Sequence, residues 1–118
     1  MYAKAIVDYI DPEKRYIDYV LSRNHCIMTG EHVVKDLRVL SHRKLENIVI
    51  VDNSVVSFAG QLDNGIYIPT YTGDTEDKEL VTIAKFLKAI VETRDVRPYV
   101  SKFAGIKNLL AEFTPPAL

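Results

Sequence analysis

The stretch that most constrains the fold is NIVIVDNSVVSF, residues 47–58, in which four β-branched residues at 48–51 run directly into Asp52 and Asn53. A half-exposed strand alternates apolar and polar residues. This run is apolar on both faces, as in a parallel strand that is covered on both sides. In open α/β sheets, functional residues collect at the carboxyl ends of such strands. Asp52 and Asn53 are therefore candidate site residues, although Asp52 would serve equally well as a cap for the following turn.

Composition narrows the class of protein. A chain of 118 residues suggests one domain, and its net charge of −1 gives no reason to expect a nucleic-acid partner. No apolar run reaches the ~20 residues that a membrane span needs, and the first residues lack the apolar core of a targeting signal. The single cysteine, Cys26, excludes an internal disulfide and suits a reducing compartment. We therefore expect an intracellular protein without a membrane span.

Hydrophobic periodicity predicts helices that alternate with strands. Apolar residues at three- and four-residue steps predict helices over 2–10, 35–46, 74–91 and 95–113, with Pro12 ending the first, Asp74 or Thr75 capping the third and TPPAL ending the last. Strand signals occur in YIDYVLSR (16–23), in CIMTGEHVV (26–34) as a hairpin, in the 48–51 run, and between an Asn-Gly turn and Pro69. This alternation predicts a three-layer α/β sandwich.

Two cations and one acidic pair are the candidates for chemistry. Lys35 follows the hairpin and can meet a phosphate as a compact point charge, although alone it would more often be a solvated surface lysine. Arg23 can bind a phosphate or carboxylate through its guanidinium fork, or else form an exposed ion pair worth ~0–1 kcal/mol. Asp52 and Asn53 offer the oxygen ligands that Mg²⁺ prefers, but two residues do not make a metal site.

Other chemistries lack support in the sequence. A structural zinc site needs paired ligands such as C-x-x-C or H-x-x-x-H, and the four candidate ligands, which are His25, Cys26, His32 and His42, are not spaced in that way. The nucleophile elbow G-x-S-x-G, the Walker loop and G-x-G-x-x-G are all absent. Nucleophilic serine chemistry and nucleotide binding are therefore not expected.

Seven short motifs occur in a specific order over roughly residues 2–103: YA, SRNHC, VVKDLRVL, IVIVDNSVVSF, DNGIYIPTYTGD, DKEL and DVRP. This series resembles the C-terminal-domain phosphatase branch of the haloacid dehalogenase superfamily, the NLI-interacting-factor-like proteins that include Dullard and the small CTD phosphatases. The combined order is far more specific than any single motif. The resemblance makes Asp52 a strong candidate for a functional residue.

The resemblance implies hydrolysis of phosphoserine or phosphothreonine in a phosphoprotein or phosphopeptide, through an aspartyl-phosphate and with Mg²⁺ as cofactor. By this resemblance, Asp52 matches the acidic Mg²⁺ ligand and Asn53 its neighbour at the metal. Lys35 matches the catalytic lysine that balances charge between nucleophile and phosphate. Arg23 and Tyr2 match residues that bind the substrate, an arginine on the phosphate and a tyrosine beside the peptide groove. A cation and a metal together offset the charge of a transferring phosphoryl group.

The chain departs from the family pattern in three respects. Val55 replaces the proline of the usual DNSP, the D-x-D-x-T motif with the nucleophile and general acid is absent, and so is the threonine or serine motif that normally precedes YA. Met1 stands where the second third of a family domain would begin. We therefore expect a partial three-layer α/β/α sandwich of haloacid dehalogenase type, with a mostly parallel sheet and with the N-terminal strands and nucleophile motif missing. Residues 1–103 would form the C-terminal part of the domain, and 104–118 a tail of unknown role.

Two functions remain open at this point. The chain is part of an active protein serine/threonine phosphatase and is inactive alone, or it belongs to a degenerate, non-catalytic protein-binding module. Relatives that act as receptors, including in mitochondrial protein import, support the second by analogy. We expect a nuclear or cytoplasmic rather than a mitochondrial location. We also expect the chain to self-associate or to need the missing N-terminal segment, because removal of the strand beside 48–51 would leave an open, β-branched edge.

Overall fold

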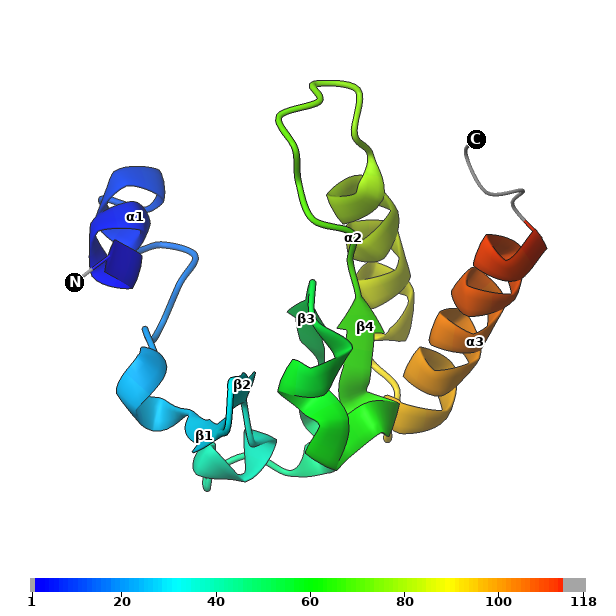
Figure 1. The fold of residues 1–118 in the computed structure, drawn as a ribbon, viewed down its shortest axis with the longest axis horizontal. Helices are drawn as coiled ribbons and strands as arrows, with labels where there is room; N and C mark the ends of the chain where they lie inside the picture. The colour runs from blue at the N-terminus through cyan, green and yellow to red at the C-terminus, as the bar shows by residue number, and fades with distance from the viewer. Residues whose placement is uncertain (1, 114–118) are drawn as a thin grey trace.

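The computed structural model describes residues 2–113, and the side chains of these as far as Gly105. In the described residues one α-helix precedes four short strands and two α-helices follow them, and the strands form two separate two-stranded sheets (Figure 1). The α-helices are α1 (Tyr2–Ile10), α2 (Glu79–Ile90) and α3 (Arg97–Phe113), and the strands are β1 (Ile27–Thr29), β2 (His32–Val34), β3 (Ile50–Asp52) and β4 (Gly65–Tyr67). Four 3₁₀ segments connect them, namely η1 (Arg23–His25), η2 (Leu37–Val39), η3 (Leu45–Asn47) and η4 (Val55–Asn64).

The N-terminal region contains one predicted helix but lacks one predicted strand. Helix α1 has the predicted bounds, and none of its residues is buried. The strand predicted at 16–23 is wrong, because residues 17–22 have no regular structure and Arg23 begins η1. The buried Asp11 accepts hydrogen bonds from the backbone N–H groups of Arg15, Tyr16 and Ile17. These bonds take donors that a strand ladder would use and fold the segment into a turn.

The predicted hairpin is confirmed, whereas the short helix that was predicted after it is wrong. Strands β1 and β2 pair antiparallel, and Gly30 at the turn has a φ of 61°, which suits glycine. Residues 35–46 contain only η2 and part of η3. Asp36 accepts the backbone N–H of Arg38, and the side-chain carbonyl of Gln61 accepts the N–H of Leu37. Side chains thus satisfy the first donors of η2, and the apolar spacing of the leucines does not extend into an α-helix.

The predicted apolar strand is present as β3, which lies parallel to β4. Ile50, Val51 and Asp52 pair with Gly65, Ile66 and Tyr67 respectively. The ordered strand begins two residues later than the predicted run and ends one residue later, at Asp52. Segment η4 connects the two strands and ends at Asn64, and Gly65 opens β4, so this Asn-Gly pair is not a hairpin turn.

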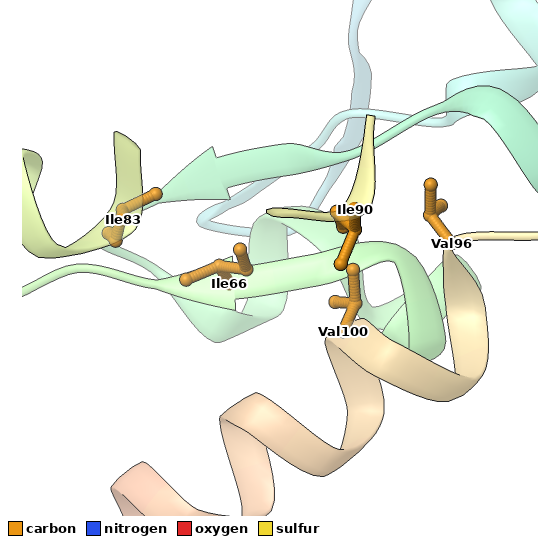
Figure 2. Packing of buried hydrophobic residues seen from close by; sticks show 5 residues of the cluster. All are labelled: Ile66, Ile83, Ile90, Val96 and Val100. Atoms are coloured by element: carbon orange, nitrogen blue, oxygen red, sulfur yellow. The ribbon is translucent and has the colours of Figure 1, made fainter. Parts of the chain in front are cut away.

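The core forms where α2 and α3 pack on β4. Figure 2 shows Ile66 of β4 between side chains of α2 and of the α3 region, namely Ile83, Ile90, Val96 and Val100. Ile66 and Val100 are both fully buried. The rings of Phe86 and Phe103 stack with centroids 4.2 Å apart and so join the two helices. Both amphipathic helices that the sequence predicts are confirmed, although the predicted end of α3 at TPPAL lies outside the described residues.

Helix α2 begins at Glu79, four residues later than a cap at Asp74 requires. Asp74 and Asp77 each accept a backbone N–H from two residues ahead, in Glu76 and Glu79. These bonds form turns in place of the first helical turns. The α/β class and the parallel pair are confirmed, and the arrangement is consistent with a partial haloacid-dehalogenase-like fold.

Candidate functional site

Asp52 lies at the carboxyl end of β3 and is almost completely buried. Its side chain is 6% exposed. One carboxylate oxygen, Oδ1, accepts the backbone N–H of Ser54 at 2.9 Å, and the other, Oδ2, accepts the ammonium of Lys35 at 2.6 Å. The turn-capping role that the sequence left open is therefore realised by the first oxygen. The second oxygen forms an ion pair, of which the carboxylate side is shielded from solvent.

The lysine of this pair reaches Asp52 from the other sheet. Lys35 follows β2, and its backbone N–H donates to the carbonyl of Ser57 in η4 at 2.7 Å. That bond fixes the end of the hairpin beside the segment that leaves β3. The Lys35 side chain remains 49% exposed, so its ammonium bridges the buried carboxylate and solvent. The structure thus brings together two residues that lie 17 positions apart.

The acid next to Lys35 in the sequence is bonded elsewhere. Asp36 accepts bonds from the guanidinium of Arg38 and from the side-chain amide of Gln61. The Arg38 guanidinium, with its backbone N–H, holds the pKa of Asp36 well below its usual range. Asp36 therefore stays ionised and paired with Arg38, and Lys35 pairs with Asp52.

Asn53 is exposed at the same end of the sheet. Its side-chain amide nitrogen donates to the hydroxyl of Thr70 at 3.1 Å, in the segment after β4. This bond links the residues that follow two neighbouring parallel strands, at the edge where functional residues of α/β sheets collect. The carbonyl oxygen of Asn53 remains available as a hard oxygen ligand.

Tyr2 and Arg23 lie in a different part of the molecule from this pair. Both line a groove of about 1060 Å³ beside α1, together with apolar side chains such as Val7, Val20 and Met28. Within the described part of the chain, the lining of this groove does not include Lys35, Asp52 or Asn53. The five predicted site residues therefore form two groups, one at the sheet edge and one in the groove.

The residues at the sheet edge have the oxygen atoms that Mg²⁺ prefers, and they supply some of its ligands. Asp52 offers a carboxylate and Asn53 a carbonyl oxygen, and Mg²⁺ commonly takes one or two carboxylates and completes its octahedron with water and phosphate oxygens. Among residues 2–105, no group of three or more His, Cys, Asp or Glu side chains gathers as a metal cluster.

The cap that Asp52 provides has a local signal, because Asp commonly accepts the N–H two residues ahead. Other contacts of the site were not predicted from the sequence. The bonds from Lys35 N–H to Ser57 and from Asn53 to Thr70 join segments far apart in the sequence. Neither has a local signal.

The sequence profile of the NLI interacting factor-like phosphatases matches residues 1–97. The chain belongs to this family. The resemblance inferred from the ordered motifs is thereby confirmed. It also agrees with the position of Asp52 at the carboxyl end of a parallel strand.

The alignments with named relatives cover most of this chain but only part of each relative. The chain is 41% identical over 112 residues to CTD small phosphatase-like protein 2 of Dictyostelium discoideum, covering 95% of this chain and 19% of the relative. It is 44% identical over 98 residues to CTD small phosphatase-like protein 3 of Caenorhabditis elegans, covering 82% and 34% respectively. It is 34% identical over 115 residues to the mitochondrial import inner membrane translocase subunit TIM50 of Kluyveromyces lactis, covering 96% and 24%. The chain thus spans about a fifth to a third of these relatives.

These relatives correct the expected location. The expectation of a nuclear or cytoplasmic rather than a mitochondrial location is wrong. Subunits of a mitochondrial translocase match almost the whole chain, so the sequence gives no reason to prefer a non-mitochondrial compartment. Among the described helices, none combines the length and apolar character needed to cross a bilayer.

Proposed function

We propose that this chain forms part of a Mg²⁺-dependent protein serine/threonine phosphatase that acts through an aspartyl-phosphate, and that the chain alone does not turn over. In this proposal Asp52 and Asn53 hold the metal and Lys35 neutralises charge on the phosphoryl group. Arg23 and Tyr2 bind the phosphoprotein or phosphopeptide substrate. The domain portion is 1–103, and 104–118 form a tail without an assigned role.

The observation that carries the proposal is the 2.6 Å ion pair between Lys35 and the buried Asp52, at the carboxyl end of a parallel strand. In this pair the Lys35 ammonium is accessible to solvent and the Asp52 carboxylate is buried behind it. A phosphoryl group bound here would meet the Lys35 ammonium directly, and charge stabilisation by fixed cations is the main contribution of a protein to phosphoryl transfer. The metal, when bound, would polarise a phosphoryl oxygen and neutralise part of its charge.

Attack on phosphorus has to come from another residue. Both oxygens of Asp52 are bonded, one to Lys35 and one to the Ser54 N–H, and the proposed role of this carboxylate is to hold the metal. D-x-D-x-T is absent from all 118 residues. A covalent intermediate requires a nucleophilic aspartate, so we infer that a D-x-D-x-T segment outside these residues supplies it. The much greater length of the curated relatives is compatible with such a segment.

Phosphate release by the purified chain tests the inactivity directly. With Mg²⁺ and either a phosphoserine peptide or p-nitrophenyl phosphate, the chain should release no more phosphate than its Asp52→Ala variant. Turnover by the chain that Asp52→Ala abolishes would contradict the proposal, because the nucleophile would then lie within these residues.

A second candidate is a non-catalytic phosphatase-like module that binds protein. Its support is the 34% identity to a mitochondrial translocase subunit and the largely apolar groove that contains Tyr2 and Arg23. Reading the transcript upstream of Met1 separates the two candidates. An in-frame D-x-D-x-T there favours the enzyme, and its absence favours the binding module.

A further inference from the structure

Asp52 is a buried carboxylate whose cationic partner among the described residues is Lys35. Its side chain is 6% exposed, and Lys35 Nζ lies 2.6 Å from Oδ2. A buried charge is stable only when it is paired and hydrogen-bonded, and here Lys35 and the Ser54 N–H meet both needs. The carboxylate is thus neutralised by a cation of this chain itself.

A divalent cation that approaches Asp52 would meet the Lys35 ammonium at the same carboxylate. The two cations repel each other, and the single negative charge of Asp52 cannot neutralise both. The neighbouring Asp36 gives no relief, since its carboxylate is bonded to Arg38 and Gln61. In the described residues, acidic side chains do not gather into a larger cluster here.

We infer that Lys35 is the resident counter-ion of Asp52 and makes binding of a divalent cation depend on a second anion at the site. The inference rests on the proposed function in taking Asp52 as a metal ligand and a phosphoryl group as that second anion. A phosphate dianion offers Lys35 a new partner and adds negative charge, so the ammonium, the metal and the carboxylate can be held together. Metal and phosphate therefore bind as a pair, and Lys35 couples them.

The experiment is a set of Mg²⁺ titrations of the 118-residue chain and its variants, with and without inorganic phosphate, at matched ionic strength. Removing the ammonium with Lys35→Met should tighten Mg²⁺ binding without phosphate by roughly tenfold, within the usual range for coupling between ligands. Phosphate should tighten binding to the unmodified chain and have little effect on Lys35→Met. Lys35→Arg keeps the charge and should behave like the unmodified chain.

Controls separate this coupling from general charge effects and from loss of fold. Arg15→Met removes an equal charge that is paired with Glu13, away from the site, and it should leave Mg²⁺ affinity unchanged. Amide spectra establish that each variant is folded, with Lys35→Gln as a second neutral variant. In the unmodified chain, ¹³C-labelled lysine gives an independent readout, because displacement from Asp52 should shift the Lys35 ε-methylene signal alone.

The outcomes distinguish this inference from the proposed function. If Asp52→Asn abolishes Mg²⁺ binding but Lys35→Met binds no more tightly than the unmodified chain, the metal site stands and the coupling is wrong. Equal tightening by phosphate in both proteins also overturns the coupling. If Mg²⁺ binding survives Asp52→Asn unchanged, the metal site lies elsewhere and the proposed function fails with it.

Discussion

Replacing Gly65 with alanine should destabilise the parallel pair that carries Asp52. Gly65 opens β4 opposite Ile50, and its φ and ψ of −104° and 134° are ordinary extended values that alanine adopts freely. The obstacle is steric, since a Cβ at this position would overlap the ring of Phe58. Phe58 is 3% exposed, so its ring cannot swing into solvent. Either the ring or β4 must shift.

The expected cost follows from this overlap. Overpacking a buried site typically costs about 1–3 kcal/mol, and the reduced freedom of the unfolded chain returns about 0.4–1 kcal/mol. The net loss should be about 1–2 kcal/mol in the free energy of unfolding. An unfolding entropy of roughly 2.1 cal/mol/K per residue converts this loss to a fall of about 4–8 °C in Tm.

Thermal unfolding followed by circular dichroism, at concentrations where the chain is monodisperse, measures the effect. Gly60→Ala is the matched control, because a Cβ there meets no atom within 4 Å, and it should change the free energy of unfolding by no more than about 0.5 kcal/mol. If both variants unfold at the same temperature, the packing of Phe58 on Gly65 does not hold β4 in register as described.

Three further predictions concern the metal, acid pH and the open strand edge. Mg²⁺ should bind the chain no more tightly than millimolar, about 4 kcal/mol, and calorimetry that finds micromolar binding unaffected by Asp52→Ala would show a site elsewhere. The Ile17 N–H, with those of Arg15 and Tyr16, lowers the pKa of Asp11. The ionised Asp11 therefore stabilises the fold at pH values above its unfolded pKa of about 4, and this stabilisation is lost as the pH falls through its lower folded pKa. Protection of the Ile17 amide from exchange, relative to its intrinsic rate, should fall over that acid range, and in Asp11→Asn it should be low at every pH. Among the described strands β3 pairs with β4 alone, so light scattering should detect self-association, and a monomer with strongly protected amides at 48–51 would refute it.

The sequence predicted the elements whose stability depends on apolar periodicity. Helices α1, α2 and α3 follow three- and four-residue spacings, and the turn of the β1–β2 hairpin is set by Gly30. These signals are local, because an amphipathic face or a positive φ is written in adjacent residues. The apolar run before Asp52 predicted the strand for the same reason.

The errors arose where side chains bond to nearby backbone. Asp11 holds a turn in place of the predicted strand, Asp36 and Gln61 cap η2 in place of a longer helix, and Asp74 and Asp77 delay α2. Such bonds compete with helices and strands for the backbone N–H groups. The spacing of apolar residues is the same with or without them, so the spacing alone does not reveal them.

The candidate site was predictable in its residue types but not in its contacts. The strand end and the family motifs singled out Lys35 and Asp52, and the structure brings them within 2.6 Å. Their roles in metal and phosphate binding stay predictions. The separation of Tyr2 and Arg23 into a groove beside α1 depends on tertiary packing, for which the sequence has no local signal.

Complementation in trans tests the central claim most directly, which is that these residues supply the metal-binding half of a phosphatase site. The chain is mixed with a family segment that carries D-x-D-x-T, and phosphate release from a phosphoserine peptide is measured with Mg²⁺. The account predicts that neither piece is active alone, that the mixture is active, and that Asp52→Ala and Lys35→Met in this chain each abolish the activity. Activity of the mixture that survives Asp52→Ala would contradict the account, since Asp52 would then have no part in the chemistry.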